Sequence, residues 1–205
     1  MFSDALNLKT EQIPRNRLWR HSITIEPTEK PEEVAELLEA LIEGLLDDED
    51  DVLYPYMVVS EGAVDRRFFE AIENAECPRF PLAGTFGRSE GAHWTNRPFV
   101  FRIADPGLIG TYVARFWGKG AFAVFFSSLE PIEFFSMIRA FGVVRREGGS
   151  LIWAPFWFAR SFEKFLTDSD ARRTKTVFRK IAYYLAEGED GSVVRVYCRG
   201  EEGAP

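Results

Sequence analysis

One stretch of the chain has a hydrophobic pattern that fits only one kind of secondary structure. Between residues 34 and 46, valine, leucine and isoleucine recur at intervals of three and four, with glutamates between them. This spacing places the apolar side chains on one face of an α-helix. Pro31 suits the first helical turn, where its missing N–H removes no hydrogen bond. The pattern predicts an amphipathic helix over residues 31–46. Packing on its own domain is favoured, with docking to a partner as the alternative.

Helical and strand patterns alternate after this helix. Strands are predicted at 54–59, 99–103 and 121–126, and helices at 63–75, 106–117 and 131–141. The second half indicates two hairpins, 142–146 with 151–158 and 177–186 with 192–198, separated by a short helix at 159–166. A short alternating stretch at 21–26 is typical of an edge strand. The order predicts an α+β (mixed α/β) fold, a mixed β-sheet with helices packed on its faces plus the N-terminal amphipathic helix.

The pattern also divides the chain into regions. Residues 1–52 form an N-terminal extension that contains the amphipathic helix and the acidic loop Asp47 to Asp51. Residues 53–199 form the main domain. Residues 200–205 lose apolar density, and we expect a disordered tail there.

Composition excludes several classes of protein. With 46% hydrophobic and 28% charged residues the chain is globular, and its net charge of −7 without a basic stripe disfavours nucleic acid as a partner. It has no signal-peptide pattern and no apolar run of about 20 residues, so we expect a cytoplasmic protein that does not bind membranes. Cys77 and Cys198 stand alone, which favours two reduced thiols over a zinc site or a disulfide.

The sequence offers little to a catalytic interpretation. Gly87 to Gly91 matches G-x-S-x-G, but no helix pattern follows Ser89, and the histidine that a catalytic triad needs late in the chain is missing. The glycines around Lys119 lack the upstream glycine of a phosphate-binding loop. His21 and His93 are too far apart to indicate a metal site. We therefore expect no enzyme, no metal and no cofactor.

Aromatic residues are the most distinctive part of the composition, at 15% of the chain. Strand alternation would direct Trp153 and Trp157 to the same side, where they form either core or an exposed interface patch. Tryptophan and arginine are common anchors of protein interfaces. Our candidate partner-binding residues are accordingly Trp153, Trp157, Arg160, Trp94 and Trp117.

The order of several motifs resembles a known family. Residues 54–63 resemble its opening strand and the turn that follows, and 77–82 its short segment after the next helix. Residues 116–139 are similar to the family's W-G, strand, serine and helix sequence, and 178–191 to its closing strand and acidic turn. Over about residues 54–198 the chain thus resembles the adaptor-chaperones of type VI secretion, the Tap or TEC proteins.

This resemblance implies a function. Such adaptors bind an effector toxin in the cytoplasm and help load it onto the spike protein at the tip of the secretion apparatus, without catalysis. One alternative is an immunity protein, which would bind and neutralise a toxin. A second alternative is a serine hydrolase that uses Ser89.

Overall fold

A computed structural model describes residues 8–13, 18–25, 30–47, 52–60, 64–82, 98–145, 151–153, 159–168, 171–188 and 191–199. Its centre is an eight-stranded sheet in the order β1-β2-β10-β9-β6-β3-β5-β4, and each neighbouring pair is antiparallel. The strands are β1 (Leu8–Ile13), β2 (Leu18–Thr24), β3 (Tyr54–Ser60), β4 (Arg79–Pro81), β5 (Pro98–Arg102), β6 (Ala123–Ser127), β9 (Tyr183–Glu187) and β10 (Val193–Arg199). The predicted α+β class, with helices on the faces of a sheet, is confirmed.

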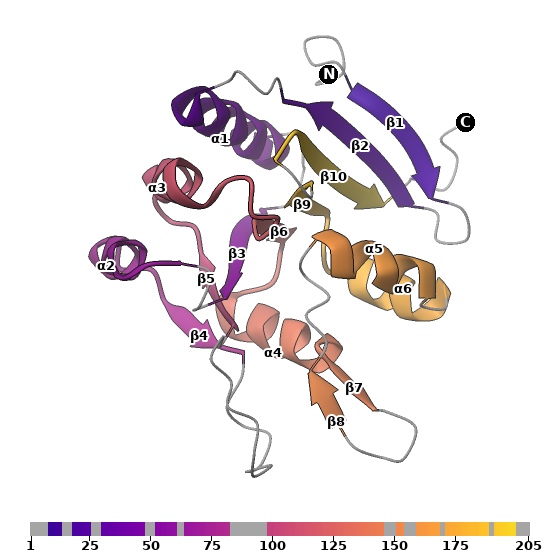
Figure 1. Ribbon diagram of the computed structural model, residues 1–205. Helices are drawn as coiled ribbons and strands as arrows, with labels where there is room; N and C mark the ends of the chain where they lie inside the picture. Colours follow the sequence, from indigo (N-terminus) through magenta and orange to yellow (C-terminus); the bar gives the residue numbers. More distant parts are fainter. Residues whose placement is uncertain are drawn as a thin grey trace.

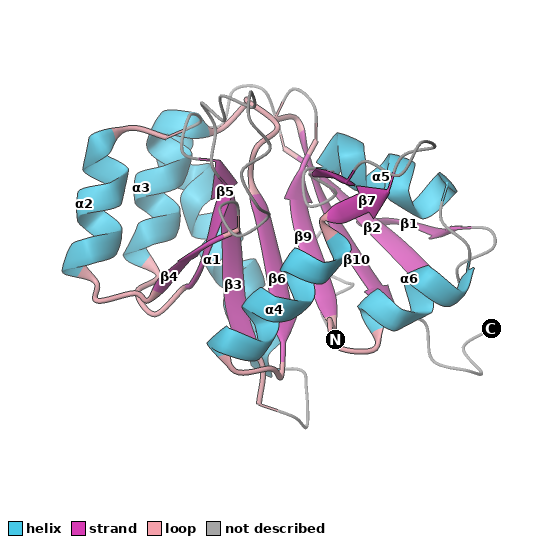
Figure 2. Cartoon of the chain, turned by 90° about the horizontal axis from the view of Figure 1, so that it is seen from below, coloured by secondary structure: helices cyan, strands magenta, loops and turns pink. Residues whose placement is uncertain are grey.

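Helices cover both faces of the sheet, which gives three layers (Figures 1 and 2). On one face lie α1 (Pro31–Asp47), α2 (Arg66–Asn74) and α3 (Gly107–Phe116). On the other lie α4 (Pro131–Phe141), α5 (Ala159–Asp168) and α6 (Ala171–Phe178). A separate two-stranded hairpin of β7 (Val143–Arg145) and β8 (Leu151–Trp153) follows α4.

The N-terminal amphipathic helix packs on its own domain, as predicted. Val34, Leu38 and Leu41 of α1 are buried in the core that also contains α3. Strand β2 lies between β1 and β10 and not at an edge, so the predicted edge strand is corrected. Its second neighbour is β1, which has no alternating apolar pattern. The segment 1–52 therefore contributes strands to the common sheet and a helix to the common core; residues 200–205 lie outside the described part.

A second correction concerns residues 177–186, which were predicted as a single strand. The structure has α6 through Phe178, then a turn, and β9 begins only at Tyr183. Val177 and Phe178 are buried in the core beneath α4, α5 and α6. This burial outweighs the local strand preference of β-branched residues.

One polar cluster fastens α5 to the sheet. The Glu163 carboxylate accepts hydrogen bonds from Arg20 of β2 at 3.1 Å and from Tyr197 of β10 at 3.0 Å, and it also contacts Arg195. Beside it, the Phe162 ring packs against Tyr184 with a centroid distance of 4.1 Å. Through Glu163, helix α5 is thus bound both to β2, early in the chain, and to β10, late in the chain.

Candidate functional site

The structure describes only some of the predicted partner-binding residues. Trp94 and Trp157 lie outside the described residues, as does Ser89. Trp153 ends strand β8 of the hairpin, and Arg160 belongs to the first turn of α5. Both therefore belong to elements on the α4 side of the sheet, whereas Trp117 packs against the core on the opposite face.

Trp117 makes contacts within the chain. It is partly buried, its indole Nε1–H donates to the carbonyl oxygen of Gly191 at 3.0 Å, and its ring packs on Phe122. Gly191 has φ +76°, and a Cβ there would lie 2.9 Å from the Cα of Gly118. These contacts fix the turn before β10 against the loop after α3, which favours a structural role for Trp117.

The same loop encloses a buried carboxylate. Glu187, at the end of β9, is fully buried and accepts hydrogen bonds from the backbone N–H groups of Gly118 and Phe122. Gly118 and Gly120 have φ values of +85° and +64°, which glycine adopts without strain and which let the loop bend around the carboxylate. We call residues 118–122 with Glu187 the Glu187 cradle. Because solvent does not reach this carboxylate, the geometry favours a structural role.

The cradle makes stability depend on pH. Burial raises the pKa of Glu187 from 4.5 to about 6, although backbone N–H groups oppose the shift. The folded protein then holds the proton more tightly than the unfolded chain. Protonation of Glu187 should therefore raise the free energy of unfolding as pH falls through 6. The full gain, about 2 kcal/mol, should be reached below pH 4.5. Urea unfolding of the wild type and Glu187→Ala across this range isolates the effect, and parallel pH profiles would contradict it.

A different group of residues has the composition of a binding surface. The Tyr54 hydroxyl, at the start of β3, donates to Glu130 Oε1 at 3.2 Å, just before α4 begins. The guanidinium of Arg102 lies 4.0 Å from the centre of the Tyr54 ring. Among the described residues Arg102 forms no ion pair, so its remaining N–H groups have no carboxylate partner there. Tyrosine and arginine are both enriched at the energetic centres of interfaces.

Two exposed apolar side chains are close in sequence to Tyr54 and to Glu130. Val52 is 71% exposed and Ile132 is 68% exposed, and they are the exposed large hydrophobic residues among those described. Val52 is two residues before Tyr54, and Ile132 is two residues after Glu130, so the Tyr54–Glu130 hydrogen bond brings their segments together. We call Val52, Tyr54, Arg102, Glu130 and Ile132 the Tyr54 corner.

The corner rests on a rigid support. Directly behind it, the Tyr56 hydroxyl donates to the carbonyl oxygen of Leu129 at 2.6 Å, and burial raises the pKa of Tyr56 so that the donor stays protonated. The Tyr56 ring stacks on Phe134 of α4 with a centroid distance of 4.1 Å and an interplanar angle of 9°. These contacts fix the start of α4 against β3. A surface held this way loses little conformational entropy when a partner binds.

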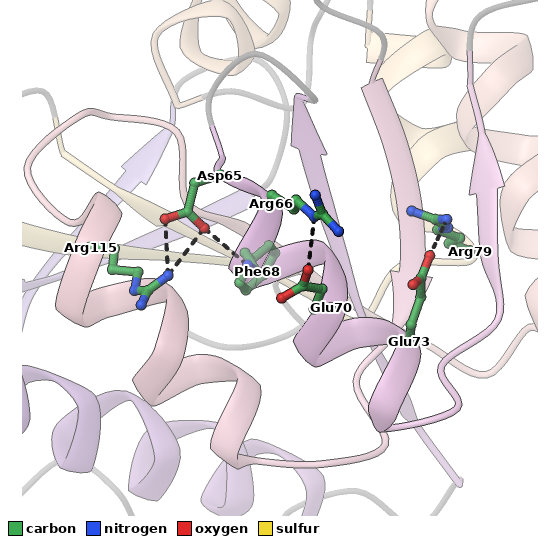
Figure 3. Close-up of polar contacts among 7 residues, drawn as sticks. All are labelled: Asp65, Arg66, Phe68, Glu70, Glu73, Arg79 and Arg115. Carbon is green, nitrogen blue, oxygen red and sulfur yellow. Dashed lines mark hydrogen bonds and ion pairs between the residues drawn. The ribbon is translucent and has the colours of Figure 1, made fainter.

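Helix α2 has a different kind of outer surface. Three of the four charged residues of α2 pair within the chain: Arg66 with Glu70 at 2.9 Å, and Glu73 with Arg79 at 2.6 Å (Figure 3). Its N-cap Asp65 accepts from the Phe68 N–H and pairs with Arg115 of α3, and these contacts hold the pKa of Asp65 below its usual value. Such a surface is typical of a solvated face.

The outer face of α4, in contrast, continues the Tyr54 corner. Ile132, Ser136 and Ala140 are exposed there at intervals of four residues, with the exposed Glu133 and the partly exposed Arg139 on the same side of the helix. The helix runs from the corner to the β7–β8 hairpin, which contains Trp153 (Figure 1). The structure thus connects one sequence-predicted residue with a surface that the sequence analysis missed. Exposure of Val52 and Ile132 depends on tertiary packing, and no local pattern marks it.

The described residues contain no group of three or more histidine, cysteine or acidic side chains placed to hold a metal ion. Nor, in this part of the chain, does any helix have the length and apolar character to cross a membrane. Comparison of the chain with protein-family models, with curated proteins and with solved structures finds no match. The resemblance to secretion adaptors therefore stays a prediction.

Proposed function

We propose that this protein is a cytoplasmic adaptor-chaperone that binds a type VI secretion effector and helps load it onto the spike protein at the tip of the apparatus. The order of motifs over about residues 54–198 supports the family. One structural observation supports binding of a partner: the two exposed large apolar side chains of the described residues belong to segments that the Tyr54–Glu130 hydrogen bond joins, next to the stacked Arg102. The Tyr54 corner and the outer face of α4 form the partner surface in this proposal.

Ile132→Asp tests this surface. The side chain is exposed, so the substitution should leave the fold intact, while an aspartate at the centre of an apolar contact should weaken binding about thirtyfold, the equivalent of about 2 kcal/mol. The measurement is affinity purification of tagged protein from its native host, with quantitative mass spectrometry of the proteins that co-purify. Loss of both a toxin and a spike component from the variant is the expected result.

A matched control is Ala40→Asp, which adds the same charge at an exposed helical position on the opposite layer. It should retain both partners. Recovery of a toxin without a spike component would favour the immunity function instead. Equal recovery by wild type and Ile132→Asp would contradict the assignment of the surface, and the absence of any specific partner of the wild type would contradict the adaptor function.

A further inference from the structure

The outer face of α1 is a continuous acidic surface. The helix contains six acidic residues and no basic one. Glu32, Glu36, Glu43 and Asp47 are exposed, and their spacing places them along one side of the helix. No positive charge interrupts this surface, because no lysine or arginine lies between residues 31 and 51. No described basic side chain pairs with these four residues.

The opposite layer carries the complementary charge. Residues 171–180, which form α6 and the turn after it, contain five basic residues and no acidic one. Lys175, Arg179 and Lys180 are exposed there, and Lys164 is exposed on the neighbouring helix α5. Glu163 of α5 is already bound by Arg20 and Arg195, so it does not neutralise this surface.

These two surfaces cannot meet within one molecule, because the sheet lies between α1 and the α5–α6 pair (Figure 2). We infer that they bind each other between copies of the chain: the acidic face of α1 in one molecule contacts the basic face of α5 and α6 in the next. This contact uses two different surfaces and is therefore head-to-tail. Such contacts build rings when the rotation closes and chains of molecules when it does not.

The inference is tested on the purified protein alone, by sedimentation velocity at several concentrations and salt levels. At low ionic strength the weight-average mass should rise above the 23.4 kDa of one chain as concentration increases. High salt should abolish the increase, since ions screen exposed charges. The double variants Lys175→Glu/Arg179→Glu and Glu36→Lys/Glu43→Lys should each stay monomeric at low salt. An equimolar mixture of the two variants should associate again, because each then offers the charge that the other lacks.

A matched control is Arg66→Glu/Arg67→Glu, which changes the net charge as much as the first double variant but on the exposed face of α2. It should associate like the wild type. A wild type that is monomeric at every salt level would overturn the inference. Association of either charge-reversed double variant alone would also overturn the inference. The same holds if the equimolar mixture of the two variants stays monomeric. The test does not involve the effector, so its result is independent of the adaptor function.

Discussion

Replacing Glu187 by alanine is expected to lower the free energy of unfolding by about 3 kcal/mol. The N–H of the buried Phe122 would lose its acceptor, and so would the N–H of Gly118, which is exposed and can bind water instead. Each unsatisfied buried donor destabilises by about 1–3 kcal/mol, and relief of the buried charge offsets part of the sum. Urea unfolding near neutral pH measures the change.

Two comparisons make this result specific to the cradle. Glu43→Ala removes an exposed glutamate from α1 and should change stability by less than about 0.5 kcal/mol. Acetate should stabilise Glu187→Ala more than the wild type, because a small carboxylate fits the vacated position and accepts the same N–H groups. A variant as stable as the wild type would show that the backbone donors find water instead.

Phe162→Ala should destabilise the fold by about 4 kcal/mol. Phe162 is fully buried, and its ring contacts Tyr184, Tyr197 and Phe178 at centroid distances of 4.1, 5.2 and 5.9 Å. Truncation would leave a cavity between α5 and the sheet, lined by aromatic rings that cannot collapse into it. Thermal or urea unfolding would detect the loss as a lower midpoint.

The control for this prediction lies on the same helix. Phe165 is only partly buried at the margin of the same core. Phe165→Ala should therefore destabilise by clearly less, about 1–2 kcal/mol. Equal losses at the two positions would mean that α5 is packed differently from the arrangement described above.

The sequence predicts the elements whose pattern is strong and local. The α1 stripe has the period of a helix, and the short continuous apolar run at 121–126 is typical of a buried strand; both are found. It fails where burial overrides local preference, as at α6, where Thr176 and Val177 favour a strand and yet the segment is helical. It also misses β1, whose place in the sheet comes from pairing with β2 and not from its own side chains.

The sites are less predictable than the fold. Glu187 was assigned to a turn, because nothing near it in sequence indicates that the loop after α3 closes around it. The glycines flanking Lys119 do not match a phosphate-binding loop, and their role around Glu187 depends on a strand about 65 residues away. Val52 and Ile132 are ordinary apolar residues in sequence. Only the hydrogen bond between Tyr54 and Glu130 places them together.

Strand β10 has a consequence for how the protein is made. It lies between β2 and β9, so β2 hydrogen-bonds on one side to residues about 170–180 positions later in the chain. At elongation rates of about 5–20 residues per second, the β1–β2 hairpin would wait about 10–35 s for that partner. During this interval one edge of β2 has free backbone donors and acceptors, which can pair with another nascent chain. The β1–β2 hairpin is thus synthesised long before its second neighbour in the sheet, and the yield of folded protein should depend on the speed of translation.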